Sequence, residues 1–258
     1  MNFFLSLLFA LFFPSCKLKI YILNVLGHEL HKSSYVGFCI LWKTKLHLDE
    51  KSKISSFSMY FVRGVVFLEA GAVLGRFNIL SGLFNLNLKE GAVISNFCQF
   101  KNGGGRVVQS STKFTLGRLS KITSGHYFDL SSSIDIGVNC VVGGRDSQFW
   151  THGFIHQDLG ETRYINITGI TIGDGVYLGS RVTLNPGTHV ADNVNILSGS
   201  VLSGEIGMDL VIGTSKKCVI YDFKNISIKD LYDIDYNYKC GNPRITKKNS
   251  PPSPPMAE

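Results

Sequence analysis

Apolar residues recur at every sixth position through the second half of the chain. An α-helix would place apolar residues three and four apart, and a half-buried strand would place them two apart. A period of six fits a short strand plus a turn, so that three such units carry the chain once around a triangular prism. The sequence therefore predicts an all-β fold, a parallel β-helix, in which the residues of this series point into the prism: Ile172, Leu178, Leu184, Val190, Ile196, Leu202 and Met208.

The same spacing occurs earlier in the chain, with breaks between runs. The runs are Leu68, Leu74, Leu80 and Leu86; Leu88, Ile94 and Phe100; Leu116, Ile122, Phe128 and Ile134; Ile136 and Val142. We expect the β-helix to occupy residues 36–215, with insertions at 102–105 and 153–169. The open end coils of such an array need caps. Residues 1–35 form an N-terminal segment, and residues 216–258 form an irregular C-terminal extension that is disordered from about residue 246.

The N-terminal stretch MNFFLSLLFALFFPSC is strongly apolar from Phe3 to Phe13. This run is too short to cross a bilayer as a helix. It resembles the apolar part of a secretory signal, but no Lys or Arg precedes it and no A-x-A site follows. We expect a short helix that lies on a membrane or on the flank of the protein itself. A peripheral membrane contact through residues 1–30 is one prediction, and a cleaved signal stays as the alternative.

Net charge and cysteine content limit which partners and which cellular compartment we expect. The 258-residue chain has a formal net charge of +7, but it contains no helix-turn-helix, zinc-finger or aromatic-basic RNA signature, so nucleic acid is not an expected partner. Its six cysteines form no C-x-x-C pair. A chain with a large core needs no disulfides, which favours reduced thiols and a cytoplasmic location.

Several segments resemble a known family. The segment ITIGDGVYLGSRVTLNPGTHVADNVNILSGSVLSGEI resembles the coils of hexapeptide-repeat acyltransferases, and SGHYFD and SQFWTHG are similar to the sugar and polysaccharide O-acetyltransferase branch. CGNPRI at 240–245 is similar to the tail that follows the last coil in that family. The resemblance implies a left-handed β-helix, acetyl-CoA as co-substrate, a saccharide or nucleotide-sugar acceptor, no metal, and a homotrimer with its sites in the grooves between prisms.

The family motif also implies roles for individual residues. A histidine on the coil before a loop and an I-G-D hexad corresponds to His152 in WTHG, which is the expected general base. The residues expected to contact acetyl-CoA lie in the following coils: Tyr177, Gly179, Ser180, Gly187, Ser198 and Gly199.

Acetyl transfer to a sugar hydroxyl needs a base, because a hydroxyl proton does not leave unaided at pH 7. A neutral histidine can take this proton and pass it to the departing thiolate. A carboxylate on the other ring nitrogen would orient the imidazole; Asp129, Asp146 and Asp158 are the candidates. The residues expected to contact the acceptor surround the WTHG motif: His126, Asp129, Trp150, His156 and Asp158. For His126 the alternative is a structural histidine at a corner, and for Trp150 it is packing between coils.

The same fold is compatible with different chemistry. Carbonic anhydrases of the γ class are zinc-binding β-helices, and His126, His152 and His156 would be the ligands here. However, the H-x-x-x-H spacing is one residue shorter than the paired ligands of that family. A non-catalytic β-helix scaffold and an N-acyltransferase acting on an amino sugar also fit this sequence.

Overall fold

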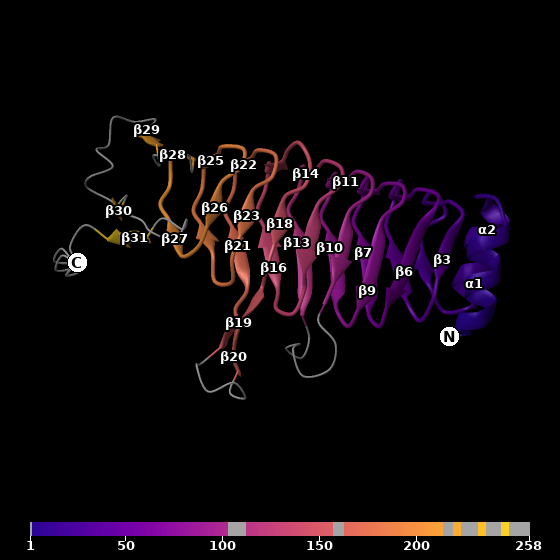
Figure 1. Cartoon of the computed structure of the whole chain (residues 1–258). Coiled ribbons are helices and arrows are strands. Elements are labelled where there is room, and N and C mark those ends of the chain that lie inside the picture. Colours follow the sequence, from indigo (N-terminus) through magenta and orange to yellow (C-terminus); the bar gives the residue numbers. More distant parts are fainter. Residues whose placement is uncertain are drawn as a thin grey trace.

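The chain forms a long rod of stacked coils with a pair of helices at one end (Figure 1). The computed structural model describes residues 2–102, 112–156, 163–213, 219–222, 232–235 and 244–247. Almost every coil contributes one short strand to each of three sheets, and neighbouring coils pair in parallel. The predicted all-β parallel β-helix is therefore confirmed.

The three sheets are the faces of the prism. Sheet A, in spatial order, contains β1 (Glu29–Leu30), β4 (Lys45–Leu48), β7 (Val65–Leu68), β10 (Asn85–Leu88), β13 (Lys113–Leu116), β16 (Ile134–Ile136), β21 (Ile170–Ile172), β24 (His189–Val190) and β27 (Glu205–Ile206). Sheet B contains β2 (Tyr35–Val36), β5 (Lys53–Ile54), β8 (Val73–Leu74), β11 (Val93–Ile94), β14 (Lys121–Ile122), β17 (Val141–Val142), β22 (Tyr177–Leu178), β25 (Asn195–Ile196), β28 (Leu210–Gly213) and β29 (Val219–Asp222). Sheet C contains β3 (Cys39–Leu41), β6 (Ser58–Val62), β9 (Ile79–Gly82), β12 (Gln99–Lys101), β15 (Tyr127–Asp129), β18 (Gln148–Phe149), β23 (Thr183–Leu184) and β26 (Val201–Leu202).

Each step of six residues carries the chain from one face to the next. Leu68, Leu74 and Leu80 lie on sheets A, B and C in turn, and each is fully buried. The side chains of successive coils therefore stack in a continuous apolar core. Burial of this apolar surface is the main favourable contribution to the free energy of folding. We call the three edges of the prism the A–B, B–C and C–A corners, after the sheets that they join.

The breaks in the six-residue phase come from sheet A. Its longer strands turn two side chains inward instead of one, as Leu86 and Leu88 of β10 show; both are fully buried. A coil with such a strand needs two extra residues, so Val66 pairs with Leu86, twenty positions on. The two-residue restarts in the sequence are therefore the signature of a wider face.

One predicted inward residue is wrong. Met208, the last of the long series, is 58% exposed, whereas Ile206 is buried. In this last coil β27 follows β26 after only two intervening residues, so His189 pairs with Glu205, sixteen positions on. The shortened C–A corner moves Ile206 to the inside and Met208 to the A–B corner.

Two helices, α1 (Phe3–Phe12) and α2 (Lys17–Val25), cover the first coil within the described part of the chain (Figure 1). The predicted helical segment therefore lies on the protein's own end. Ala10 of α1 and Leu23 of α2 are fully buried and belong to the hydrophobic core. The ammonium of Lys19 is also buried and donates hydrogen bonds to the carbonyls of Ala10, Phe13 and Gly37.

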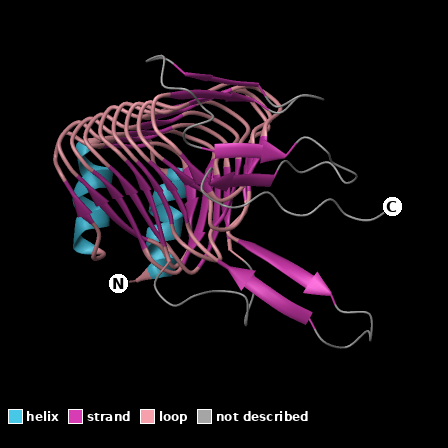
Figure 2. Cartoon of the chain, turned by 90° about the vertical axis from the view of Figure 1, so that its left-hand side faces the viewer, coloured by secondary structure: helices cyan, strands magenta, loops and turns pink. Residues whose placement is uncertain are grey.

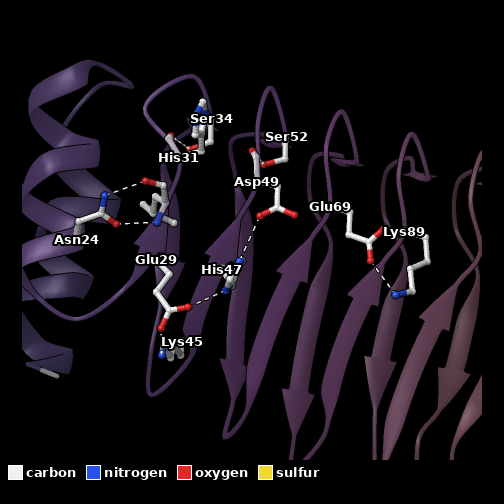
Figure 3. A network of polar contacts seen from close by, with 11 residues as sticks. Asn24, Glu29, His31, Ser34, Lys45, His47, Asp49, Ser52, Glu69 and Lys89 are labelled. Atoms are coloured by element: carbon white, nitrogen blue, oxygen red, sulfur yellow. Dashed lines mark hydrogen bonds and ion pairs between the residues drawn. The ribbon is translucent and has the colours of Figure 1, made fainter.

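A polar network joins α2 to the first strands of sheet A (Figure 3). The Asn24 side chain exchanges two hydrogen bonds with the backbone of Leu30, at 2.7 and 2.8 Å. On the outer surface of the sheet, Glu29 pairs with Lys45 and His47, and His47 also contacts Asp49. These contacts fix the helical cap to the first two coils.

Further strands leave the prism. An antiparallel hairpin of β19 (His152–His156) and β20 (Arg163–Ile167) projects from the C–A corner (Figure 2), in place of the loop expected at 153–169. In the C-terminal extension, β29 pairs antiparallel with β28, and β30 (Tyr232–Asp235) pairs with β31 (Arg244–Lys247). Disorder was predicted from about residue 246, and beyond the end of β31 at Lys247 these positions lie outside the described residues. Positions 103–105 of the expected insertion at 102–105 also lie outside the described residues.

Candidate active site

Two neighbouring coils deliver the candidate catalytic residues to the C–A corner. Phe128 on β15 and Phe149 on β18 point into the core and stack with their ring centroids 4.5 Å apart. Asp129 directly follows Phe128, and His152 lies three residues after Phe149. The stacking of the two rings therefore aligns the two coils where the chain leaves sheet C. Asp129 and His152 are thereby brought together from consecutive coils.

The side chains of Asp129 and His152 are hydrogen-bonded. Oδ2 of Asp129 lies 2.7 Å from Nδ1 of His152. The carboxylate is buried, with 2% of its side chain exposed, whereas the imidazole keeps 20% of its surface open. An ionised carboxylate only accepts hydrogen bonds, so the proton of a neutral His152 resides on Nδ1 and the lone pair on Nε2.

Asp129 is held by several donors. Its Oδ2 accepts hydrogen bonds from the backbone N–H of Thr151 and from the Thr151 hydroxyl, both at 2.9 Å. Its Oδ1 accepts a hydrogen bond of 2.8 Å from the hydroxyl of Ser131. Hydrogen bonding favours the charged form of a buried carboxylate. The Asp129 carboxylate is therefore held behind the imidazole of His152. Because this side chain is buried, it cannot contact an acceptor, and the predicted direct contact of Asp129 with substrate is wrong.

Aromatic rings surround the imidazole. The indole of Trp150 lies edge-on to His152 with centroids 6.4 Å apart and packs on Tyr127 at 4.9 Å. The ring of Phe154, which is exposed, also lies edge-on to His152, with centroids 5.9 Å apart. The indole N–H of Trp150 is directed to the side chain of Gln148. Trp150 is half-buried beside His152 and packs against Tyr127 of the preceding coil, which agrees with the alternative of packing between coils and leaves its contact with an acceptor a prediction.

His126 does not reach the surface, so its expected role in the acceptor site is wrong. It is 1% exposed. Its Nδ1 accepts a hydrogen bond from the backbone N–H of Ser147, and its Nε2 lies 3.0 Å from the hydroxyl of Thr123. Burial lowers the pKa of His126 to about 4, although the Asp146 carboxylate opposes this shift. It is a neutral structural histidine at the B–C corner.

The remaining candidates around the WTHG motif lie apart from the Asp129–His152 pair. Asp146 is 60% exposed on the B–C corner, 3.8 Å from Arg181, and so does not orient His152. The backbone of His156 pairs with that of Arg163 across the hairpin, and the side chain of His156 is not among those that the structure describes. Asp158 lies outside the described residues.

An open hollow of about 500 Å³ occupies the B–C corner. Three of the residues expected to contact acetyl-CoA line it, namely Ser180, Ser198 and Gly199, together with Arg145, Asp146 and Arg181. Two guanidinium groups at the rim suit an anionic ligand such as a phosphate. Gly179 comes directly before this corner, and Tyr177 lies on the outer surface of sheet B, 45% exposed.

The hollow and His152 lie on different corners of one chain. Ser180 precedes β23 of sheet C, whereas Gly187 follows β23 and lies on the C–A corner with His152. The full width of sheet C therefore separates the two sets of residues. Gly187, with a positive φ of 80°, provides the turn on the coil next to His152.

The sequence analysis missed the hydroxyls that position Asp129. Ser131 and Thr151 are ordinary residues in DLSSS and WTHG, and the one available signal was their closeness in sequence to Asp129 and His152. No group of three or more His, Cys, Asp or Glu side chains is placed to hold a metal ion within the described residues. The burial of His126 also removes it from the zinc set considered for a γ-class anhydrase.

No family model matches the sequence. The chain is 29% identical over 104 residues to galactoside O-acetyltransferase from Escherichia coli strain K12, a match that covers 40% of this chain. The chain spans about half the length (51%) of this curated relative.

One of two similar solved structures supports the fold. The polySia-specific acetyltransferase NeuO superposes with a TM-score of 0.50 at 15% identity, covering 71% of this chain and 80% of that one. A hexapeptide-repeat acetyltransferase from Vibrio cholerae O1 biovar eltor, complexed with acetyl coenzyme A, gives a TM-score of 0.41 at 18% identity, covering 58% and 69%. The sequence similarity to galactoside O-acetyltransferase and the superposition on NeuO confirm the predicted resemblance of this chain to hexapeptide-repeat acetyltransferases, which was made from its repeats and its WTHG motif.

Proposed function

We propose that this protein is an acetyltransferase that moves an acetyl group from acetyl-CoA to a sugar hydroxyl, with His152 as the general base. The observation that carries the proposal is the 2.7 Å contact of His152 Nδ1 with the buried, hydrogen-bonded Asp129. It leaves a basic Nε2 on a partly exposed ring. Sequence similarity to a galactoside O-acetyltransferase supports the choice of reaction and of a saccharide or nucleotide-sugar acceptor.

The reaction needs one proton to move twice. Nε2 of His152 takes the proton of the acceptor hydroxyl while the hydroxyl oxygen attacks the thioester carbonyl carbon. The C–O bond forms, the C–S bond breaks, and the imidazolium returns the proton to the thiolate sulfur, giving the O-acetyl sugar and free CoA. Asp129 stabilises the imidazolium between the two steps. No covalent enzyme intermediate and no metal are required.

Substrate contacts follow from the two corners. Arg145 and Arg181 would bind the phosphates of acetyl-CoA, with Ser180, Ser198 and Gly199 lining the same hollow. The indole face of Trp150, beside His152, would pack on the acceptor sugar. Because acetyl-CoA is made inside cells, we place the reaction in the cytoplasm, next to the membrane where lipid-linked saccharides are assembled.

A homotrimer would bring the two corners together. Sheet C has little charge on its outer surface: Asp129 is covered, and among the other outward-facing residues of its strands Lys101 is the one charged side chain, whereas sheet A presents Glu29, Lys45, Lys113, Asp135 and Glu205. Met59 and Phe61 of β6 are exposed on this face. Three copies with sheet C facing a common axis would place the B–C corner of one copy against the C–A corner of the next.

The B–C corner supports this arrangement. Phe57, Phe77 and Phe97 from successive coils stack there, with centroids 5.5 and 5.0 Å apart, and about half of each ring is exposed. All three have positive φ, a conformation that costs a bulky residue about 1–2 kcal/mol. Exposed phenylalanines at strained positions do not help the single chain to fold, so we propose that they pack against a neighbouring copy.

The proposed activity is tested by release of free CoA from acetyl-CoA in the presence of nucleotide sugars and saccharides. The wild type, His152→Ala and His189→Ala are compared, because His189 is an exposed histidine on sheet A. Acceptor-dependent CoA release that is lost only in His152→Ala and is insensitive to chelator supports the proposal. Equal activity of the two variants would refute the role of His152. Cleavage of the product by mild alkali identifies an ester and separates O-transfer from N-transfer.

A further inference from the structure

The helix that caps the first coil turns its small side chains inward and leaves several of its large ones exposed. Ser6 and Ala10 of α1 are 1% and 0% exposed, whereas Phe4 and Phe12 are 60% and 67% exposed. The outward surface of α1, α2 and the turn between them forms one set of exposed residues, which we call the apolar cap: Phe4, Leu5, Phe12, Phe13, Leu18, Tyr21 and Val25.

Covering the end coil does not explain this arrangement. A cap that only shields a β-helix needs apolar groups inside and polar groups outside. Here α1 contains no charged residue, and its single serine faces the protein. Large apolar side chains exposed in this number on two neighbouring helices indicate an interaction site.

The helices are fixed in this orientation. Lys19 donates hydrogen bonds to the carbonyls of Phe13 at the end of α1 and of Gly37 in the first coil, at 2.9 and 2.8 Å. Nε2 of the buried His28 lies 3.1 Å from the hydroxyl of Ser6. The apolar cap is therefore held outward by buried polar contacts.

The surroundings of the apolar cap are basic. Exposed lysines lie on α2 and on the first coils: Lys17, Lys32, Lys43 and Lys53. Residues 1–60 contain seven lysines and three acidic residues, a net charge of +4 out of +7 for the whole chain. A second copy docked cap to cap would bring these like charges together, which opposes association. An anionic surface would be attracted.

We propose that the apolar cap binds the surface of a lipid bilayer that contains anionic headgroups. Within the described residues no helix is long and apolar enough to cross a membrane. The ten-residue α1 would instead lie in the plane of the interface, with its phenylalanines among the acyl chains and the lysines at the headgroups.

This orientation stands the prism on its N-terminal end. His152 follows β18, which is five strands from β3 in the order of sheet C. At about 4.8 Å per strand, the candidate active site lies roughly 24 Å further from the bilayer than the first coil. Binding is independent of acetyl transfer, although it would concentrate the enzyme near a membrane-linked acceptor.

The test is flotation of the full-length protein with vesicles of phosphatidylcholine alone or mixed with phosphatidylglycerol, without acetyl-CoA. The double variant Phe4→Ser/Phe12→Ser removes two exposed rings. Met208→Ser is the matched control, because Met208 is equally exposed at the far end of the prism. We expect wild type and Met208→Ser to float with the anionic vesicles and the double variant to bind at least about tenfold more weakly. Lys17→Ser/Lys32→Ser should weaken binding to the anionic vesicles alone.

Thermal melting of each variant, followed by circular dichroism, tests whether the fold is retained. Absence of wild-type flotation with either kind of vesicle would overturn the proposal, and so would equal flotation of the wild type and the Phe4/Phe12 variant. A mass in solution that depends on Phe4 and Phe12, without vesicle binding, would assign the apolar cap to a second copy of this chain and would also overturn it. Because no acceptor or donor is present, neither result depends on whether the proposed transferase activity is correct.

Discussion

Nδ1 of His152 lies 2.7 Å from Oδ2 of Asp129, although the two residues are 23 positions apart in the chain. The distance follows from the stacking of consecutive coils, which pairs Phe128 with Phe149 in register. Both side chains leave sheet C at the same corner. The pair therefore depends on the stacking of coils and not on closeness in the sequence.

Asp129→Asn should remove most of the activity without unfolding the protein. The amide has nearly the shape of the carboxylate, but it carries no charge to stabilise the imidazolium and can fix the wrong tautomer of His152. We expect kcat to fall by about 10²–10⁴ with little change in KM for acetyl-CoA. Steady-state kinetics of CoA release measure both constants. Asp135→Asn, an exposed carboxylate paired with Lys113 on sheet A, is the control, and a similar loss in that variant would argue against a specific role for Asp129.

Replacing the stacked phenylalanines should separate subunits without destabilising the chain. In Phe57→Asn/Phe77→Asn/Phe97→Asn, asparagine tolerates the positive φ that strains phenylalanine. We expect light scattering to report about three times 28.5 kDa for the wild type and 28.5 kDa for the variant.

Leu119→Asn is the matched control for this experiment. Leu119 is also exposed with positive φ, but it lies on the A–B corner, opposite sheet C. It should leave the mass unchanged. A monomeric wild type, or a trimer that survives the triple substitution, would contradict the proposed contact.

Stability should fall on acidification because of two buried histidines. Burial lowers the pKa of His28 and of His126 to about 4, with Lys45 adding to the effect at His28. Between pH 6.5 and about 4 the unfolded chain binds protons that the folded chain does not, so the free energy of unfolding decreases by up to about 3 kcal/mol per histidine.

Urea unfolding at a series of pH values between 7 and about 4 measures this dependence. His126→Gln lowers stability at pH 7 by losing hydrogen bonds, but it should also make the dependence on pH shallower. An unchanged slope in this variant would show that His126 does not stay neutral in the folded protein.

Stacking of the coils should be sensitive to glycines where backbones approach. A Cβ at Gly117 would lie 2.1 Å from the carbonyl oxygen of Gly137 on the next coil. Gly117→Ala therefore forces two coils apart, and we expect a loss of about 3 kcal/mol in the free energy of unfolding. At Gly153 a Cβ would meet nothing within 4 Å, so Gly153→Ala should change stability by less than about 0.5 kcal/mol. Equal losses in the two variants would contradict this account.

The sequence alone determined the architecture, because the fold repeats a local rule. Each six-residue step places one side chain inside, so positions such as Leu74, Leu80 and Leu178 could be assigned to the core without coordinates. The family motif also singled out His152. The period could not predict Met208, because a corner shortened by two residues changes which side chain faces inward in the last coil.

Only the tertiary structure decided what surrounds His152. Three aspartates were equivalent candidates in the sequence, and stacking of consecutive coils selects Asp129, with Ser131 and Thr151 as its donors. His126 looked similar to His152 as a motif residue, yet its ring is buried and bonded at another corner. The orientation of the N-terminal helices was equally open, since an apolar run does not say which side packs. The physical reason is the same in each case: a hexad fixes a residue's face within one coil, whereas its partners come from the coil above or below.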